Sequence, residues 1–150
     1  MKRFAFLFFL AMVPVIELRG SVPIGLGWGL PFWQVMLVSV IGNCCIIVPV
    51  VLLGERVLEA IATWPYIGAF GRKMLDRARR KAESITDALL VGLFLFVAIP
   101  LPGTGAWTGS LVAAVLDLPV RRAFWPIAAG VITAGIIMAA GTFGVFHLVH

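Results

Sequence analysis

The chain has 150 residues, of which 61% are hydrophobic and 13% are charged. Soluble domains carry about 25% charged residues, so this composition excludes an ordinary soluble domain and indicates a protein of the lipid bilayer. The net charge of +5 does not indicate nucleic-acid binding, because most basic residues fall between residues 54 and 86.

The first residues resemble a secretory signal, because Met1, Lys2 and Arg3 precede an apolar run. A small-residue cleavage site does not follow, and Glu17 and Arg19 stand where it is expected. We therefore predict a membrane segment that is retained.

Hydropathy predicts four membrane elements. Residues 4–30 form a first segment that is interrupted, and residues 32–53 form a continuous apolar run. Residues 87–118 hold a second interrupted segment, and residues 123–149 form the last span. A membrane-spanning helix needs about 20 residues, so both continuous runs are long enough to cross.

The first interruption follows Pro14, where the apolar run meets Glu17, Arg19, Gly20 and Pro23. Proline lacks a backbone N–H and disrupts a helix interior. Backbone groups freed in this way are tolerated at membrane depth only inside protein or beside a wet cavity.

The second interruption is rich in proline and glycine. Its polar and helix-breaking residues are Pro100, Pro102, Gly103, Thr104, Gly105 and Thr108. Paired interruptions in corresponding halves of a membrane protein are a sequence pointer to a transport site.

A polar linker over residues 54–87 separates the two halves and contains many Lys and Arg residues. Residues 71–84 fit a short basic amphipathic helix at the headgroups. Short loops rich in Lys and Arg stay in the cytoplasm, so we expect the linker there.

The halves look duplicated. An offset of 86 places Pro14 on Pro100 and Phe8 on Phe94, and an offset of 92 places Phe32-Trp33 on Phe124-Trp125. We therefore predict one membrane domain over 1–150, built from repeats over about 4–53 and 88–149. Chance similarity between apolar segments is the alternative.

Two topologies remain open from the charges. If both interrupted segments are re-entrant hairpins, Lys2 and Arg3 lie outside and Arg121 and Arg122 lie inside. If both cross fully, these positions are exchanged, so each topology misplaces one basic pair. The charged and proline-rich break favours re-entrance.

Glu17 and Arg19 are the first candidates for a site. A charge near the bilayer centre costs about 2.5–3.5 kcal/mol, so such residues face a cavity or a partner. In a functional interpretation Arg19 binds an anionic group, and Glu17 carries a proton or neutralises Arg19. In a structural interpretation the two form an interfacial ion pair.

The second break supplies the other half of the predicted site. Glycines allow close approach of the backbone to a ligand, and the N-terminus of the helix that follows favours anions. The predicted substrate- or ion-binding residues are Glu17, Arg19, Gly20, Pro23, Pro100, Pro102, Gly103, Thr104, Gly105 and Thr108. A plain tight turn is the alternative for the second break.

The sequence contains neither a nucleophile–base pair nor a phosphate-binding loop. It also has no cluster with metal-ligand spacing, and Cys44 and Cys45 are adjacent within an apolar run. We expect a protein that is not an enzyme and that uses no cofactor and no metal.

Both broken motifs, Pro14-x-x-Glu17-Leu18-Arg19-Gly20 and Pro100-Leu101-Pro102-Gly103-Thr104-Gly105, resemble the signature segments of the small multidrug export protein family. That family in turn resembles the DedA/VTT superfamily. The second resemblance implies paired re-entrant hairpins, an acidic residue at Glu17, and movement of lipids or phosphate-bearing carriers. DedA-type proteins carry an arginine where this chain has Gly105, which leaves anion binding to Arg19 or to backbone amides.

These observations predict an all-α integral membrane protein made of two inverted repeats, each a re-entrant hairpin followed by a transmembrane helix. We expect a small transporter of an anionic or amphiphilic substrate, coupled to protons through Glu17, and a homodimer in a bacterial or archaeal inner membrane. The alternatives are a flippase or scramblase for lipid or polyprenyl phosphate, and a membrane scaffold that transports nothing.

Overall fold

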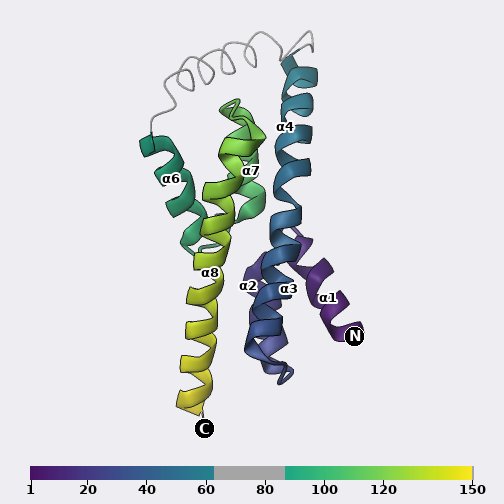
Figure 1. The fold of residues 1–150 in the computed structure, drawn as a ribbon, viewed down its shortest axis with the longest axis vertical. Helices are drawn as coiled ribbons and strands as arrows, with labels where there is room; N and C mark the ends of the chain where they lie inside the picture. The colour runs from purple at the N-terminus through teal and green to yellow at the C-terminus, as the bar shows by residue number, and fades with distance from the viewer. Residues whose placement is uncertain (63–86, 150) are drawn as a thin grey trace.

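The computed structural model describes residues 1–62 and 87–149, and every element within them is an α-helix (Figure 1). In chain order the helices are α1 (Lys2–Met12), α2 (Glu17–Gly27), α3 (Phe32–Cys45), α4 (Ile47–Ala62), α6 (Asp87–Ala98), α7 (Ala106–Val115) and α8 (Val120–Val149). The amphipathic helix predicted over 71–84 and most of the basic linker lie outside the described residues.

Both predicted interruptions are present. Helix α1 ends at Met12, before Pro14, and α2 begins at Glu17. Helix α6 ends at Ala98, just before the Pro100 turn. Each end follows from proline, which cannot supply the N–H of a continuing helix and restricts the residue before it.

The long apolar run predicted over 32–53 forms one helical segment, Phe32–Gly54. Helices α3 and α4 are divided only at Ile46, which keeps helical backbone angles of φ −78° and ψ −24°. Pro49 explains the division, because the carbonyl of Cys45 loses the N–H that would lie four residues ahead. Helix α4 then continues past Gly54 to Ala62.

The two halves are arranged alike along the long helices (Figure 1). Helices α1 and α2 lie in the lower half of the view, with α1 against α3 and α2 against both α3 and α8. Helices α6 and α7 lie in the upper half, with α6 against α8 and α7 against α4. The breaks of both pairs meet halfway along the molecule.

Two glycines allow equivalent close contacts in the two halves. A Cβ on Gly42 would lie 2.6 Å from the carbonyl oxygen of Phe8, and a Cβ on Gly130 would lie 2.9 Å from that of Phe94. Small residues let membrane helices approach each other closely. In both halves, therefore, the first helix packs backbone against backbone on the long helix.

The predicted equivalence of the two Phe-Trp pairs is not reproduced by the helix ends. Phe32 is the first residue of α3, whereas α8 begins at Val120 and Phe124 lies about one turn inside it. The glycine contacts indicate an offset of 88 for the long helices, from Gly42 to Gly130. The two carbonyls that these glycines meet, on Phe8 and Phe94, are 86 residues apart.

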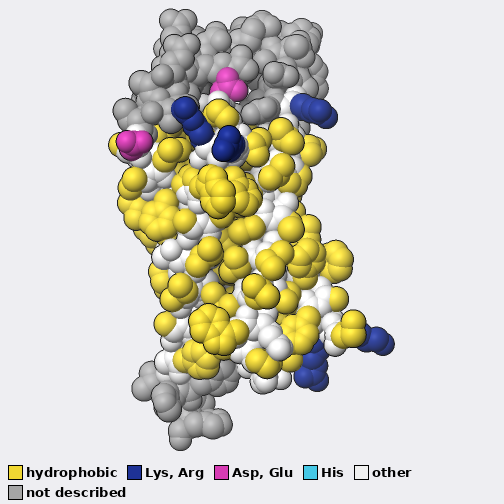
Figure 2. Space-filling model, viewed as in Figure 1, with side chains coloured by type: hydrophobic (Ala, Val, Ile, Leu, Met, Phe, Trp, Pro, Cys, Tyr) yellow, Lys and Arg dark blue, Asp and Glu magenta, His cyan; other side chains and the backbone are white. Residues whose placement is uncertain are grey.

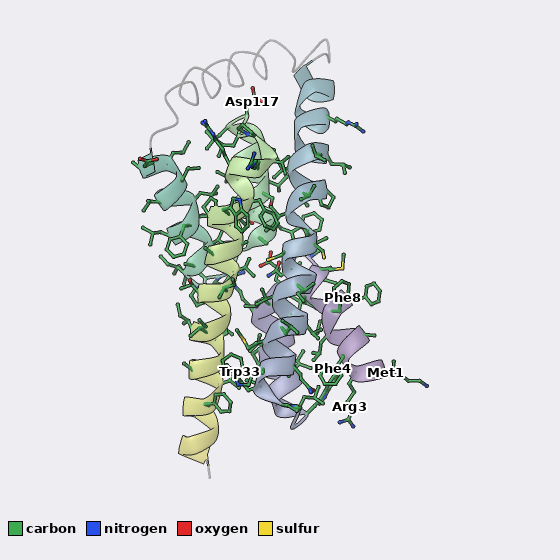
Figure 3. All side chains as sticks on the ribbon, in the orientation of Figure 1. Met1, Arg3, Phe4, Phe8, Trp33 and Asp117 are labelled. Atoms are coloured by element: carbon green, nitrogen blue, oxygen red, sulfur yellow. The ribbon has the colours of Figure 1, made fainter. Side chains whose placement is uncertain are left out.

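The outer surface is apolar over much of its height. Figure 2 shows a band of hydrophobic side chains, with Lys and Arg side chains above and below it. Trp33 is 79% exposed and Trp125 is 68% exposed. Arg3 and Asp117 mark the opposite ends of the molecule (Figure 3).

Two helical segments are long and apolar enough to cross a membrane. They are Phe32–Gly54, with a mean hydropathy of 2.6, and Val120–Gly144, with a mean hydropathy of 1.9. Together with the exposed apolar band, these helices indicate a membrane protein.

Candidate functional site

The charge pair predicted at the first break is formed inside the protein. The Nη1 of Arg19 donates to Oε2 of Glu17 across 2.6 Å, and Glu17 is only 3% exposed. Glu17 has φ +49°, in the left-handed region, which costs a residue with a side chain about 1–2 kcal/mol. The break thus brings together two side chains that a regular helix would direct apart.

The Glu17 carboxylate caps the first turn of α7 in the other half. Its Oε1 accepts a hydrogen bond from the backbone N–H of Trp107 across 3.2 Å. A Cβ on Gly105, the residue before α7, would collide with this carboxylate. A carboxylate is favourable at a helix N-terminus, where free N–H groups and the helix dipole are positive. The anion that occupies this N-terminus is therefore Glu17 itself.

Arg19 connects the first break to the second. Its Nη2 donates to both the carbonyl oxygen and the Oγ1 of Thr104, each across 2.8 Å. The Thr104 hydroxyl in turn donates to the carbonyl of Ile99, 2.6 Å away. Arg19 thus supplies charged donors to a loop whose carbonyls have lost their helical partners.

Trp107, in the second half, in turn binds a backbone group of the first half. Its indole Nε1 donates to the carbonyl of Met12 across 2.9 Å, at the end of α1. Backbone groups freed by the breaks are satisfied across the junction, as apolar surroundings require. Trp107 is not among the binding residues predicted from the sequence. An indole N–H beside a broken helix was the available signal.

A tight turn shapes the second break. The N–H of Thr104 donates to the carbonyl of Leu101 across 3.2 Å, and Gly103 has φ +84°. Pro102 before Gly103 fits a type II turn, whose third residue needs a positive φ. Pro100, Pro102 and Gly103 thus set the path of this loop.

The remaining predicted site residues differ in their position. Gly20 lies next to Arg19, and a Cβ there would collide with the Ile16 side chain. Pro23 lies inside α2, further from the break, and Thr108 lies in α7. Neither side chain forms a hydrogen bond with Glu17 or Arg19. The structure therefore gathers Glu17, Arg19, Thr104 and Gly105 most closely.

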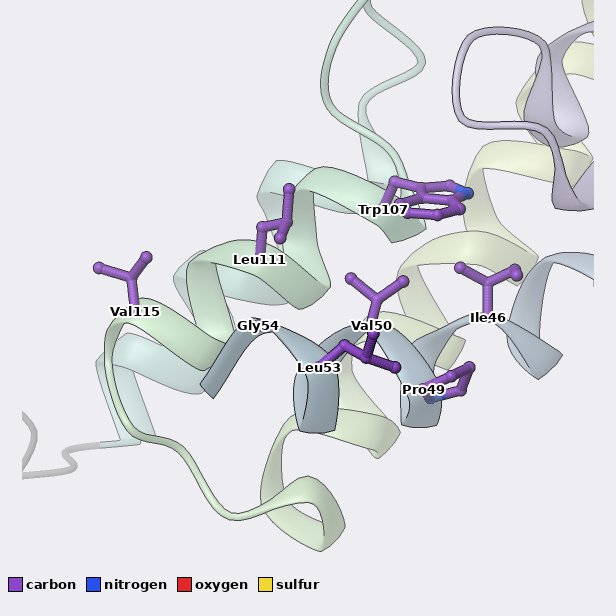
Figure 4. Close-up of a pocket in the computed structure, with 8 residues that line it drawn as sticks. All are labelled: Ile46, Pro49, Val50, Leu53, Gly54, Trp107, Leu111 and Val115. Carbon is purple, nitrogen blue, oxygen red and sulfur yellow. The ribbon is translucent and has the colours of Figure 1, made fainter. Parts of the chain in front are cut away.

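An apolar groove of about 310 Å³ lies beside the junction, between α4 and α7 (Figure 4). Ile46, Pro49 and Val50 line it from one side, and Trp107 and Leu111 line it from the other. Trp107 belongs to both features, because its backbone binds Glu17 while its ring faces the groove. A polar cluster and an apolar groove are thus adjacent.

Over residues 1–62 and 87–149, the structure has no group of three or more His, Cys, Asp or Glu side chains that could hold a metal ion. The one carboxylate at the junction is already bound by Arg19 and α7.

A sequence model of a known family matches residues 17–137, and its description is "Putative small multi-drug export protein". Neither a curated protein nor a solved structure matches the chain. The further resemblance to the DedA/VTT superfamily therefore stays a prediction. The description names an export protein, which fits the apolar helices of the chain. Because the match begins at Glu17 and covers most of the 150 residues, the chain belongs to the small multi-drug export protein family.

Proposed function

We propose that this protein is a small membrane transporter whose substrate site lies where the tips of two re-entrant hairpins meet. The observation that carries the proposal is the buried Glu17–Arg19 pair, which holds the two breaks together at mid-height. Ionisable residues at membrane depth mark substrate and ion pathways.

Helix length supports the re-entrant hairpins. Helices α1 and α2 have 11 residues each, α6 has 12 and α7 has 10. At 1.5 Å per residue they are about 15–18 Å long, roughly half of a hydrocarbon core of about 30 Å. Such helices reach the middle of a bilayer and do not cross it.

The direction of the chain supports two inverted repeats. Both termini lie in the half of the molecule opposite to the C-terminal end of α4 and the start of α6 (Figure 1). The first hairpin therefore enters from one end and the second hairpin from the other. The paired contacts of Gly42 and Gly130 follow the same relation.

The polar and apolar parts of the junction together favour an anionic or amphiphilic substrate. The Nε of Arg19 is a buried donor without a hydrogen-bond partner in the described part of the chain. Such a donor is costly to leave unpaired, so an acceptor on a substrate would be stabilised there. The neighbouring groove between α4 and α7 would hold an apolar tail.

Glu17 gives a route to proton coupling. Its negative charge attracts Arg19 and the N-terminus of α7, and both attractions weaken when the carboxylate is protonated. The two tips would then separate and release Arg19 for another anion. This step couples proton binding to alternating access between the hairpins.

The test uses purified protein in liposomes and a fluorescent alkyl phosphate as an amphiphilic anion. An imposed pH gradient should drive the probe across the membrane with wild-type protein. Glu17→Gln should lose the dependence on the gradient while the protein stays folded. The control is Asp87→Asn, which changes an exposed carboxylate at the start of α6. Gradient-driven transport at the wild-type rate in Glu17→Gln would remove Glu17 from the mechanism.

The groove also favours a second candidate, a flippase or scramblase for lipids or polyprenyl phosphate. A neutral fluorescent phosphatidylcholine separates the two. Translocation of this lipid at the same rate as the alkyl phosphate, without a pH gradient, would favour the scramblase. A scaffold that transports nothing would move neither probe.

We also propose the inner membrane as the location and a homodimer as the assembly. The basic linker favours an orientation with residues 54–87 in the cytoplasm. Few helices are available in one chain to enclose a pathway, so a second copy would complete its walls.

A further inference from the structure

Several buried polar side chains beside the junction have no hydrogen-bond partner. Among the described residues, these are the Oγ of Ser21, the Oγ of Ser39, the Oδ1 of Asn43 and the Oγ of Ser110. All four residues are at most 2% exposed. Most buried polar groups in proteins are hydrogen-bonded, to protein or to ordered water.

The three serines differ from two threonines of α8. Thr133 and Thr142 each donate to the carbonyl four residues earlier, across 2.9 and 2.8 Å. This bond within the helix is the usual solution for a hydroxyl in an apolar setting. The serines do not use it, so their hydroxyl groups remain available to another partner.

Helix register places three of these residues in one row. A Cβ on Gly25 of α2 would lie 2.7 Å from the Cγ1 of Val35 on α3, so these two positions face each other. The helices are antiparallel, and residues four apart share a face. One turn further, this periodicity pairs Ser21 with Ser39, and another turn places Asn43 beside the start of α2 at Glu17.

Closely packed side chains border this row of polar residues at one end and on the side that faces α8. At the end away from Glu17, the same Cβ on Gly25 would lie 2.9 Å from Leu7 of α1. On the side of α8, a Cβ on Gly135 would lie 2.8 Å from Met36 and 3.3 Å from Leu18. The polar row therefore ends at apolar side chains, and its other end is the Glu17–Arg19 pair.

We propose that Ser21, Ser39 and Asn43 bind ordered water between α2 and α3, along the polar row that extends inward from Glu17. Three neutral oxygens are suited to water, since a buried water forms about three hydrogen bonds to groups that otherwise lack partners. The role of this water rests on the proposed function, because it would exchange protons with Glu17. Its existence does not.

A double-mutant cycle on the full chain in detergent tests the water site. Ser21→Ala and Ser39→Ala should each lower the midpoint of thermal unfolding by about 2–4 °C, because each removes hydrogen bonds to shared water. The double variant should lower it no further than the larger single change. If no water is bound between these serines, each substitution should instead raise the midpoint, since it removes an unpaired hydroxyl.

Ser110→Ala is the matched control, because Ser110 is equally buried but lies on α7. Its effect should add to that of Ser39→Ala. Additive effects of Ser21→Ala and Ser39→Ala would overturn the shared site. A bound cation instead of water would give a different result. The midpoint of thermal unfolding would then be higher in sodium chloride than in choline chloride, and Ser39→Ala would abolish this difference.

The two proposals fail in different experiments. Absence of any gradient-driven movement of the alkyl phosphate by wild-type protein would end the proposed function, while the unfolding cycle would still decide the water site. Conversely, if no water is bound between Ser21 and Ser39, the transport measurements still decide the role of Glu17.

Discussion

The guanidinium of Arg19 is shared between the two segments where the chain breaks. It binds Glu17 in its own half and Thr104 in the other. Removal of one partner from a buried ion pair leaves an uncompensated charge, which costs about 3–5 kcal/mol. The Arg19 side chain is 18% exposed, so water offsets part of this cost.

Arg19→Ala should therefore lower the free energy of unfolding by about 3 kcal/mol. Denaturation by guanidinium in detergent, followed by tryptophan fluorescence, measures the change. The double variant Glu17→Gln with Arg19→Ala should recover part of the loss, because the remaining group is then neutral. Equal stability of Arg19→Ala and wild type would show that the pair does not hold the tips together.

Gly105 faces the Glu17 carboxylate so closely that a methyl group has no space. Gly105→Ala should displace Glu17 from the N-terminus of α7 and destabilise the protein by about 1–3 kcal/mol. The control is Gly27→Ala, at the end of α2, where a Cβ would have no neighbour within 4 Å. Similar melting midpoints for both variants would contradict the observed contact.

Glu17 and Arg19 could be selected from the sequence, because charges in an apolar segment are rare and costly. Their partners could not. The partners of Glu17 and Arg19 include backbone groups at Trp107 and Thr104, about 85–90 residues further along the chain, and backbone groups carry no sequence signature. The buried serines were missed for a similar reason, since only the packing of α2 on α3 removes them from solvent.

At the scale of the helices, α1 packs against α3 through Gly42 and α6 packs against α8 through Gly130. In both contacts a Cβ would meet a backbone carbonyl. A carbonyl in a helix cannot turn aside as a flexible side chain can, so the helices would have to separate.

Gly42→Ala and Gly130→Ala should each destabilise the protein by about 1–3 kcal/mol. Gly92→Ala and Gly141→Ala are matched controls, because a Cβ at either site has no neighbour within 4 Å. Alanine also favours the helix over glycine, so the controls should be neutral or more stable. Thermal unfolding of the four variants tests this prediction. Equal losses of stability in all four would contradict the close packing at Gly42 and Gly130.

The order of the helices and both breaks could be predicted from hydropathy and proline. The division between α3 and α4 at Ile46 and the extension of α4 to Ala62 could not. Pro49 lies only a few residues into α4, where proline either kinks a helix or begins a new one. Hydropathy falls at Gly54, although a helix can continue out of the bilayer into polar sequence.

At the scale of the whole molecule, the two topologies differ in where they place the ends of α4 and α8. The C-terminal part of α4 and the start of α8 lie at the same end, opposite to the N-terminus (Figure 1). Re-entrant hairpins require this arrangement. Four full crossings would instead place Arg56 on the side of Lys2 and Arg121 on the other side.

Single cysteines at Lys2, Arg56 and Arg121 test the arrangement, since all three side chains are exposed. Cys44 and Cys45 are first replaced by alanine to remove the native thiols. In intact cells a membrane-impermeant thiol reagent should label Lys2→Cys, whereas Arg56→Cys and Arg121→Cys should react only after lysis. Basic residues favour this orientation for α4 and α8, with their charged ends in the cytoplasm. Labelling that groups Arg56→Cys with Lys2→Cys would mean that the first broken segment crosses the bilayer, and the junction of Glu17 with α7 could not then lie between two re-entrant tips.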